Sequence, residues 1–202
     1  MKLSCLLEEM EYECVQGTLD REITTLVYDS RKVEKDSAFV CISGAVCDGH
    51  DFAQEVAKKG AAVLFIEKDV EVPEDVTVIR VQNTRLALAQ TSAAYFRHPA
   101  KELITIGITG TKGKTTATYM VRSILEASGF KTGLIGTIET IIGEEKIPSA
   151  NTTPESYVVQ ESFRKMADAG SKCVVMEVSS QALMLHRVSG FVFDIGVFTN
   201  LE

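Results

Sequence analysis

The chain has 202 residues, of which 45% are hydrophobic and 24% are charged, and its formal net charge is −7. This length allows one large domain or two small ones, with a core that needs no disulfide or metal to hold it together. The composition excludes disorder, and the negative charge argues against general binding to nucleic acid or to an anionic membrane. No apolar run approaches the length of about 18 residues that a bilayer-crossing helix needs, and no signal-peptide core follows Met1. We therefore expect a cytoplasmic protein.

The five cysteines are odd in number and contain no C-x-x-C pair; they are Cys5, Cys14, Cys41, Cys47 and Cys173. In a chain without an export signal, this pattern is typical of reduced thiols and not of a disulfide framework. We expect most of these thiols to be buried, and their spacing does not favour a metal cluster.

Short β-branched runs alternate with helical segments along the first half of the chain. The runs at residues 24–29, 38–42, 61–66 and 76–81 are rich in Val, Ile and Phe, and they predict strands. Residues 51–59 predict a helix that stops at Gly60, and residues 84–97 carry apolar side chains at helical spacing. Pro99 ends this second helix because it cannot donate a backbone hydrogen bond, so we place a domain boundary near residues 98–101.

The second half of the chain repeats the pattern with clearer periods. Residues 103–108 form a mainly apolar run, which is typical of a strand buried on both faces of a parallel sheet. The further predicted elements are helices at 114–128 and 155–169 and strands at 132–135, 173–177 and 192–198. This alternation predicts an α/β fold with a mainly parallel sheet in the second domain and a small α/β domain before it. Because the chain ends directly after a strand that looks buried, we expect a fragment of a longer enzyme.

The most informative stretch is G-I-T-G-T-K-G-K-T-T at residues 107–116, between a predicted strand and a predicted helix. Gly110 and Gly113 allow the backbone to turn successive N–H groups into one cavity, where the helix N-terminus adds partial positive charge. Lys114 can reach the β- and γ-phosphates of a nucleotide, and the Thr115 hydroxyl can join the shell of a Mg²⁺ ion. The stretch therefore predicts a phosphate-binding loop.

Two further polar stretches follow predicted strands or precede a helix. Glu177 ends the apolar run at 173–177, and ligands of open α/β sheets bind beyond the carboxyl ends of the strands. A carboxylate there can hold a hard cation through oxygen. Asn151, Thr152 and Thr153 precede a helix that begins with a proline, and their amide and hydroxyl groups can hold polar groups of a substrate.

Each signal also has a structural alternative. Ile108 stands where the strict phosphate-loop pattern has its first glycine, and a glycine-rich turn with a solvated Lys114 is the alternative. Glu177 can be a solvated residue at the end of a strand, and the stretch at 151–153 can simply cap a helix. The spacing alone does not separate these interpretations.

Taken together, these stretches resemble the ATP-dependent Mur ligase family of peptidoglycan synthesis, and the resemblance covers essentially the whole chain. The residues that carry it are Asp29-Ser-Arg31, Gly44 with Asp48-Gly-His50, and residues 110–116, 151–154, 176–180, 186–187 and 198–200. Their order and spacing are most similar to the branch of the family that adds the third residue of the peptide. The phosphate loop alone is also shared with folylpolyglutamate synthetases.

The resemblance implies a UDP-substrate-binding domain at residues 1–98 and an incomplete ATP-binding domain at 99–202, with a C-terminal amino-acid-binding domain beyond the chain. The implied cofactors are ATP and Mg²⁺. The implied cofactor-binding residues are Gly110, Thr111, Lys112, Gly113, Lys114, Thr115 and Thr116, with Lys114 as the catalytic residue and Thr115 and Glu177 on the metal. The implied substrate contacts are Tyr28, Ser30, Ala45, Val46 and Cys47 near the nucleotide, and Asn151, Thr152, Thr153, Ser179 and Arg187 around the muramoyl-dipeptide. The guanidinium of Arg187 suits a carboxylate or a pyrophosphate, and an ordinary surface arginine is its alternative.

The implied activity is ATP-dependent amide formation through an acyl phosphate. A diamino acid, either meso-diaminopimelate or L-lysine, is added to UDP-N-acetylmuramoyl-L-alanyl-D-glutamate. The expected partners are therefore these small molecules, and neither nucleic acid nor membrane is expected. This chain alone is expected to be inactive, because the amine-selecting part lies outside it. A non-catalytic nucleotide-binding module and a sister ligase of the Mur or folylpolyglutamate type remain the two alternatives.

Overall fold

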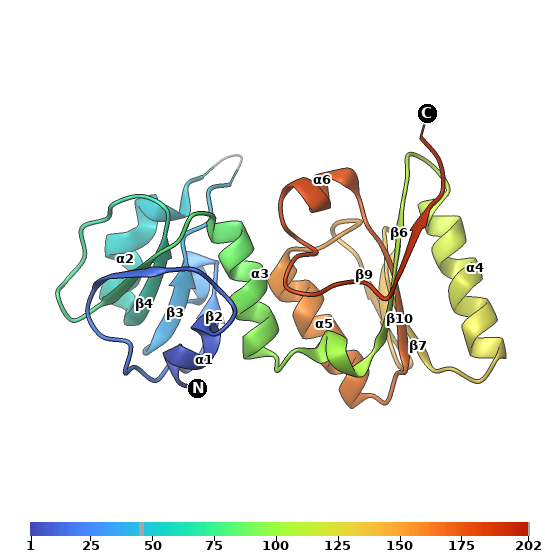
Figure 1. Cartoon of the computed structure of the whole chain (residues 1–202), viewed down its shortest axis with the longest axis horizontal. Helices are drawn as coiled ribbons and strands as arrows, with labels where there is room; N and C mark the ends of the chain where they lie inside the picture. The colour runs from blue at the N-terminus through green and yellow to red at the C-terminus, as the bar shows by residue number, and fades with distance from the viewer. Residues whose placement is uncertain (45–46, 202) are drawn as a thin grey trace. The chain divides into compact units, whose positions relative to one another are not determined.

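The computed structural model describes residues 1–44 and 47–201 and divides into two compact units, Met1–Tyr95 and Phe96–Glu202 (Figure 1). Each unit is built on one mainly parallel sheet with helices packed against it, so the predicted α/β fold is confirmed. Among the described residues, no helix has both the length and the apolar character that crossing a bilayer requires.

The first unit has a five-stranded sheet in the order β1-β5-β4-β3-β2. Its elements are α1 (Leu3–Leu7), β1 (Glu13–Gln16), β2 (Leu26–Val27), η1 (Ser30–Lys32), β3 (Ser37–Val40), η2 (Gly49–Phe52), α2 (Ala53–Lys59), β4 (Ala61–Ile66), β5 (Thr77–Arg80) and α3 (Thr84–Tyr95). Strands β2 to β5 pair in parallel, and only β1 runs antiparallel to its neighbour β5. Helix α2 packs on one face of the sheet and α3 on the other (Figure 1).

The core of the first unit lies along β3 and β4. All six residues of β4 are buried, as expected for a central strand of a parallel sheet. Phe39 and Leu64 of the sheet pack with Val56 of α2 in one apolar cluster. Gly60 ends α2 with a φ of 106°, a backbone conformation that only glycine adopts without strain.

The second unit has a six-stranded sheet in the order β11-β6-β10-β7-β8-β9. Its elements are η3 (Pro99–Glu102), β6 (Ile104–Thr109), α4 (Lys114–Ala127), β7 (Thr132–Ile135), β8 (Glu139–Ile142), β9 (Glu145–Pro148), α5 (Ser156–Asp168), β10 (Cys173–Glu177), α6 (Ser180–Met184) and β11 (Ile195–Phe198). The first four strands of this order pair in parallel, and β8 and β9 form an antiparallel hairpin on β7. Two parallel strands therefore flank β6, which leads into the predicted phosphate loop.

The two faces of the second sheet pack against different helices, as Figure 1 shows for α4 and α5. Successive side chains of a strand point to opposite faces, and β10 follows this rule. Val175 packs with Ile106 and Ile108 of β6 against α4. Val174 and Met176 pack on the other face with Phe163 of α5. The sheet is thus covered on both faces and holds the carboxyl ends of its central strands in fixed positions.

The predicted strand at residues 192–198 is shorter and more exposed than expected. Strand β11 begins only at Ile195, and it lies at the edge of the described sheet, where it pairs with β6 alone. Val192 is 90% exposed and Phe198 is 63% exposed. The expectation of burial was wrong because an apolar run is buried only where a second layer covers it.

The cysteines also correct an expectation. All five are free thiols, as predicted, but Cys5, Cys14 and Cys47 are exposed. Only Cys41 and Cys173 are buried, and burial raises the pKa of the Cys41 thiol to about 12. Cys173 lies in the central strand β10 and Cys41 directly follows β3, whereas the exposed Cys14 belongs to β1, which lies at the end of its sheet.

Several element boundaries differ from the predicted ones for local reasons. Strand β2 ends at Val27 because the side chain of Asp29 accepts the N–H of Arg31 and caps η1. Helix α3 ends at Tyr95, and the positive φ of the two residues before Pro99 breaks the helix earlier than expected. The short elements α1, β1 and α6 and the hairpin of β8 and β9 were not predicted.

We expect Phe163→Ala to lower the free energy of unfolding by about 3–5 kcal/mol, because it leaves a cavity under α5. The matched control is Phe130→Ala, which removes the same ring from a position that is 43% exposed. Urea unfolding followed by circular dichroism measures both variants. Equal losses in the two variants would contradict this account of the core.

Candidate functional site

The predicted phosphate loop and Glu177 meet at one edge of the second sheet. Strands β6 and β10 pair in parallel, with Glu177 in register with Ile108, so both strands end at the same edge. The loop follows β6, and the hydroxyl of Thr115 donates a hydrogen bond of 2.8 Å to Oε2 of Glu177. The expectation that these groups share an edge of the sheet is confirmed.

The loop has the backbone that a phosphate site needs. Gly110 and Gly113 have φ values of 137° and 81°, in the region that favours glycine. Helix α4 begins directly after Gly113, and no side chain caps it there. Among the residues that the structure describes, its first N–H groups therefore have neither an intrahelical nor a side-chain acceptor, which is the arrangement that binds anions.

An open hollow of about 570 Å³ lies beside this helix N-terminus. Its lining consists of Thr115, Thr116, Tyr119, Met120, Ser123, Ile124 and Ile138. Of the loop residues, Thr115 and Thr116 line this hollow, which otherwise follows α4 away from the loop.

The end of β11 holds the outer side of the loop. The N–H groups of Thr111 and Lys112 donate to the main-chain oxygen and to Oδ1 of Asn200, both at 3.0 Å. The hydroxyl of Thr199 donates to the carbonyl oxygen of Lys112 at 2.8 Å. Asn200 therefore binds two of the N–H groups that we expected to face a phosphate. The N–H groups that remain for a phosphate are those of Gly113 and the first turn of α4.

Lys114 lies across the loop and does not extend into solvent. Its Nζ donates to the carbonyl oxygens of Gly110 at 2.6 Å and of Thr111 at 3.3 Å. These bonds fix the ammonium group above the loop, so the alternative of a solvated surface lysine does not describe this residue.

Glu177 is a buried carboxylate, with 1% of its surface exposed. Besides the Thr115 bond, Oε1 accepts the N–H of Thr137 at 2.8 Å, and Oε2 accepts the Thr137 hydroxyl at 3.1 Å. Within residues 1–44 and 47–201, no Lys, Arg or His side chain pairs with it. A buried carboxylate without a cationic partner is costly, so this position suits a bound cation and is not a solvated strand end.

The spacing of one oxygen pair at Glu177 is common to an O–H···O hydrogen bond and to a magnesium shell. Octahedral Mg²⁺ binds oxygen at about 2.0–2.1 Å, so neighbouring ligands lie about 2.9 Å apart. The Thr115 and Glu177 oxygens are separated by 2.8 Å. No cluster of three or more His, Cys, Asp or Glu side chains suited to a metal occurs in the described part of the chain. The donor set therefore fits an ion that also takes ligands from phosphate or water.

The stretch at residues 151–153 lies against the end of β10. Thr153 is buried, and its hydroxyl donates to the carbonyl oxygen of Glu177 at 2.8 Å and accepts the N–H of Ser179 at 3.1 Å. Thr152 lies near the residues that bond to the Glu177 carboxylate, with its hydroxyl 3.0 Å from that of Thr137. Asn151 is exposed.

The alternative of a helix cap at residues 151–153 is wrong, because Glu155 is the N-cap residue of α5 and makes no side-chain cap bond. Ser179, in contrast, caps α6 by accepting the N–H of Ala182 at 3.1 Å. The fold thus uses the hydroxyls of Thr153 and Ser179 to shape the end of β10.

Arg187 joins the same region from the segment after α6. Its guanidinium donates to Oε1 of Glu155 at 2.8 Å and to the carbonyl oxygen of Thr153 at 3.1 Å. Its side chain is 17% exposed, so it is not an ordinary surface arginine. The structure brings it together with Thr152, Thr153 and Ser179 around the end of β10.

The residues predicted to contact the nucleotide of a UDP-substrate belong to the first unit. Tyr28 follows β2, Ser30 begins η1, and the exposed Cys47 lies in the segment after β3. Strands β2 and β3 are parallel neighbours, so these residues lie beyond the carboxyl ends of the two strands, on the same side of the sheet. The other two predicted contacts, Ala45 and Val46, lie outside the described residues.

The base of the loop after β3 is fixed by Asp48. Its carboxylate bonds to Nζ of Lys68 at 2.5 Å, to Nδ1 of His50 at 2.6 Å and to the hydroxyl of Ser43 at 3.2 Å. These bonds, mainly the one from Lys68, hold the pKa of the Asp48 carboxyl well below its usual range. On the other side of the ring, Nε2 of His50 accepts the N–H of Glu67 at 2.9 Å.

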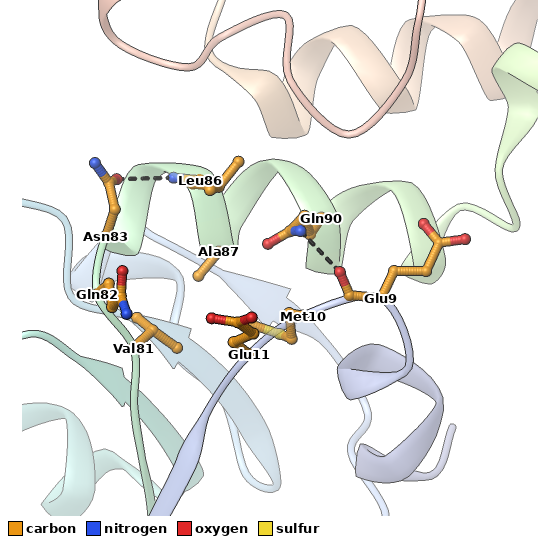
Figure 2. A pocket seen from close by; sticks show the side chains of 9 residues that line it. All are labelled: Glu9, Met10, Glu11, Val81, Gln82, Asn83, Leu86, Ala87 and Gln90. Atoms are coloured by element: carbon orange, nitrogen blue, oxygen red, sulfur yellow. Dashed lines mark hydrogen bonds between the residues drawn. The ribbon is translucent and has the colours of Figure 1, made fainter.

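A separate cavity of about 450 Å³ lies beside α3 in the first unit (Figure 2). It is lined by Glu9, Met10, Glu11, Val81, Gln82, Asn83, Leu86, Ala87 and Gln90. Two of its amide groups are used internally, since Oδ1 of Asn83 accepts the N–H of Leu86 and Nε2 of Gln90 donates to the carbonyl oxygen of Glu9. None of the described residues that line this cavity is basic, so it is unsuited to a diphosphate.

We expect Asp48 to make the stability of the first unit depend on pH. The folded pKa of this carboxyl lies below the unfolded value of about 3.9, so its stabilisation is present above that pH and is lost as the pH falls through the folded pKa. The difference in unfolding free energy between wild type and Asp48→Asn should therefore shrink between about pH 5 and pH 2. The control Asp69→Asn alters an aspartate that is 92% exposed and should show little pH dependence. A difference that stays constant for Asp48→Asn would contradict the assignment.

Two family models match consecutive parts of the chain. The model described as Mur ligase family, catalytic domain, matches residues 22–96, and the Mur ligase middle domain matches residues 108–202. The chain is 49% identical over 201 residues to "UDP-N-acetylmuramoyl-L-alanyl-D-glutamate--2,6-diaminopimelate ligase" of Clostridium perfringens, a match that covers 100% of this chain and 42% of that protein. The protein of the same name from Bacillus velezensis is 50% identical over 202 residues, covering 100% of this chain and 41% of the relative.

Solved structures of low sequence identity share the fold. A structure of a UDP-N-acetylmuramoyl-L-alanyl-D-glutamate--2,6-diaminopimelate ligase has a TM-score of 0.80 at 21% identity and covers 100% of this chain and 40% of that one. MurF ligase from Thermotoga maritima, solved in complex with ADP, has a TM-score of 0.52 at 22% identity and covers 77% of this chain and 32% of that one. This chain, which spans about two fifths of the length of the relatives it matches, belongs to the Mur ligase family.

Proposed function

We propose that this chain supplies the substrate-binding and ATP-binding parts of a ligase that adds 2,6-diaminopimelate to UDP-N-acetylmuramoyl-L-alanyl-D-glutamate. Residues 1–98 are assigned to the UDP end of the substrate and residues 99–202 to ATP and Mg²⁺. The names of the relatives support the reaction, and the length of those relatives assigns the complete reaction to a longer protein.

One observation carries the proposal. A helix N-terminus without a side-chain cap and a buried carboxylate without a cationic partner face each other across a hydrogen bond of 2.8 Å. The first group suits the phosphates of a nucleotide and the second suits the cation that accompanies them. Either group alone has a structural explanation, but their contact favours binding of a metal-nucleotide complex.

The chemistry requires two anions to meet. A carboxylate cannot form an amide efficiently with an amine at neutral pH because oxide is a poor leaving group. In the proposed reaction, the terminal D-Glu carboxylate attacks the γ-phosphorus of ATP and releases ADP, and the amine then displaces phosphate from the acyl phosphate. Positioning and charge neutralisation are therefore the main tasks of the protein.

The residues of this chain suit those tasks. The ammonium group of Lys114, held above the loop, lies where it can contact the phosphates. The N–H groups from Gly113 onward supply hydrogen bonds to the same groups. Bound Mg²⁺ would be held by Thr115 and Glu177 and would supply further positive charge to the phosphate oxygens.

The remaining proposed contacts concern the UDP-dipeptide. Asn151 and Thr152 are proposed to touch the muramoyl-dipeptide directly. Thr153, Ser179 and Arg187 are proposed to shape that pocket. The Thr153 hydroxyl donates to the carbonyl oxygen of Glu177, Ser179 accepts the N–H of Ala182, and Arg187 donates to the carbonyl oxygen of Thr153. At the nucleotide end, the proposed contacts are Tyr28, Ser30, Ala45, Val46 and Cys47.

We expect Lys114→Ala to weaken Mg·ADP binding by about 10- to 100-fold, because hydrogen bonds to charged groups contribute about 1.5–3 kcal/mol. Isothermal titration calorimetry measures ADP binding, and a parallel titration with the UDP-dipeptide should give an unchanged affinity. The matched control, Lys112→Ala, removes an ammonium group from the same loop and keeps the main-chain N–H that binds Asn200. Wild-type affinity for Mg·ADP in Lys114→Ala would exclude this loop as the phosphate site.

A further inference from the structure

We infer that Thr137 positions the carboxylate of Glu177 for the cation and thereby determines how strongly Mg²⁺ promotes nucleotide binding. This inference rests on the proposed function. Thr137 was not singled out by the sequence, because nothing in the loop between β7 and β8 matches a known ligand motif.

Thr137 contacts both oxygens of Glu177. Its N–H donates to Oε1 at 2.8 Å, and its hydroxyl donates to Oε2 at 3.1 Å. The terminal torsion of a glutamate has a broad energy profile, so the carboxylate plane is fixed only by such contacts. Two bonds from one residue, one to each oxygen, set the orientation of that plane.

The preceding residue makes this approach possible. A Cβ atom on Gly136 would lie 2.5 Å from Oε1 of Glu177, which is closer than a Cβ atom comes to a non-bonded oxygen. The absence of a side chain at Gly136 lets the main chain at Thr137 reach the carboxylate. Gly136 and Thr137 therefore act together as a holder for the carboxylate.

The holder is independent of the phosphate loop. Thr115, the other residue that bonds to the carboxylate, belongs to the first turn of α4 and is itself proposed to bind the cation. Thr137 comes instead from the connection between β7 and β8. When the Thr115 oxygen turns to a cation, the two bonds from Thr137 remain to hold Glu177 in place.

Thr137 also links the cation site to the stretch proposed to bind substrate. Its hydroxyl oxygen lies 3.0 Å from that of Thr152 and 3.1 Å from Oε2 of Glu177. The Thr137 hydroxyl therefore contacts both the carboxylate and the stretch at residues 151–153. A purely structural role in closing the turn between β7 and β8 is the competing explanation. The two explanations differ in whether the effect of a variant depends on Mg²⁺.

The test compares ADP binding to the 202-residue chain with Mg²⁺ and with EDTA, by calorimetry. Thr137→Val keeps the shape and the main-chain N–H but removes the hydroxyl, and Thr137→Ser restores the hydroxyl. In EDTA, we expect the valine variant to bind ADP with the affinity of the wild type. The factor by which Mg²⁺ raises the affinity for ADP should be about tenfold smaller in the variant than in the wild type. The serine variant should recover most of that gain.

Two further variants complete the test. Thr24→Val removes a hydroxyl from the first unit and should change neither titration. Thr137→Ala, with its unfolding midpoint measured alongside, replaces the valine variant if that one does not fold. Equal losses with and without Mg²⁺, or no loss at all, would overturn the positioning role while leaving the proposed function intact. Failure of the wild-type chain to bind ADP under either condition would instead overturn the proposed function and, with it, this inference.

Discussion

The hydrogen bonds to the carboxylate of Glu177 are the contacts on which the second unit's candidate site depends. They join the phosphate loop, through Thr115, to the connection between β7 and β8, through Thr137. The main-chain oxygen of the same glutamate is held by Thr153. Three segments that are distant in sequence therefore converge on one buried charge. Since burying an unpaired carboxylate is costly, its presence here is explained best by the cation that we propose it binds.

The parallel pairing of β6, β10 and β11 creates this convergence. Parallel neighbours end at the same edge, so β6 delivers the loop, β10 delivers Glu177, and β11 delivers Asn200. Asn200 then takes two N–H groups of the loop for itself and leaves those at the start of α4 for a ligand. The same strand order therefore holds the loop at Thr111 and Lys112 and leaves the N–H groups at the start of α4 for a ligand.

Much of this fold could be predicted from the sequence. Strands β4, β7 and β10 have the predicted bounds, because short, mainly apolar runs between polar or glycine breaks leave little ambiguity. The glycine spacing at residues 107–116 and the position of Glu177 at a strand end were also sufficient to predict that the two lie at one edge. The hairpin of β8 and β9 had a signal that was overlooked, since Gly143, with a φ of 60°, opens a two-residue turn directly after the apolar end of β8.

Other features depend on contacts that no local pattern encodes. The contact of Thr137 with Glu177 arises only when β7 and β10 pair side by side, which brings together residues 40 positions apart. The burial of Thr153 and the contacts of Asn200 likewise depend on the strand order. The exposure of β11 shows the converse, because its apolar run looks like a core strand but lies at an edge of the described sheet.

A crystal structure of this chain with Mg·ADP tests the central claim most directly. The account predicts that the β-phosphate accepts hydrogen bonds from the N–H groups of Gly113 and the first turn of α4, with the metal ion between Thr115 and Glu177. It also predicts that Asn200 keeps its bonds to Thr111 and Lys112. A nucleotide bound elsewhere, or a metal ion that does not contact Glu177, would contradict it.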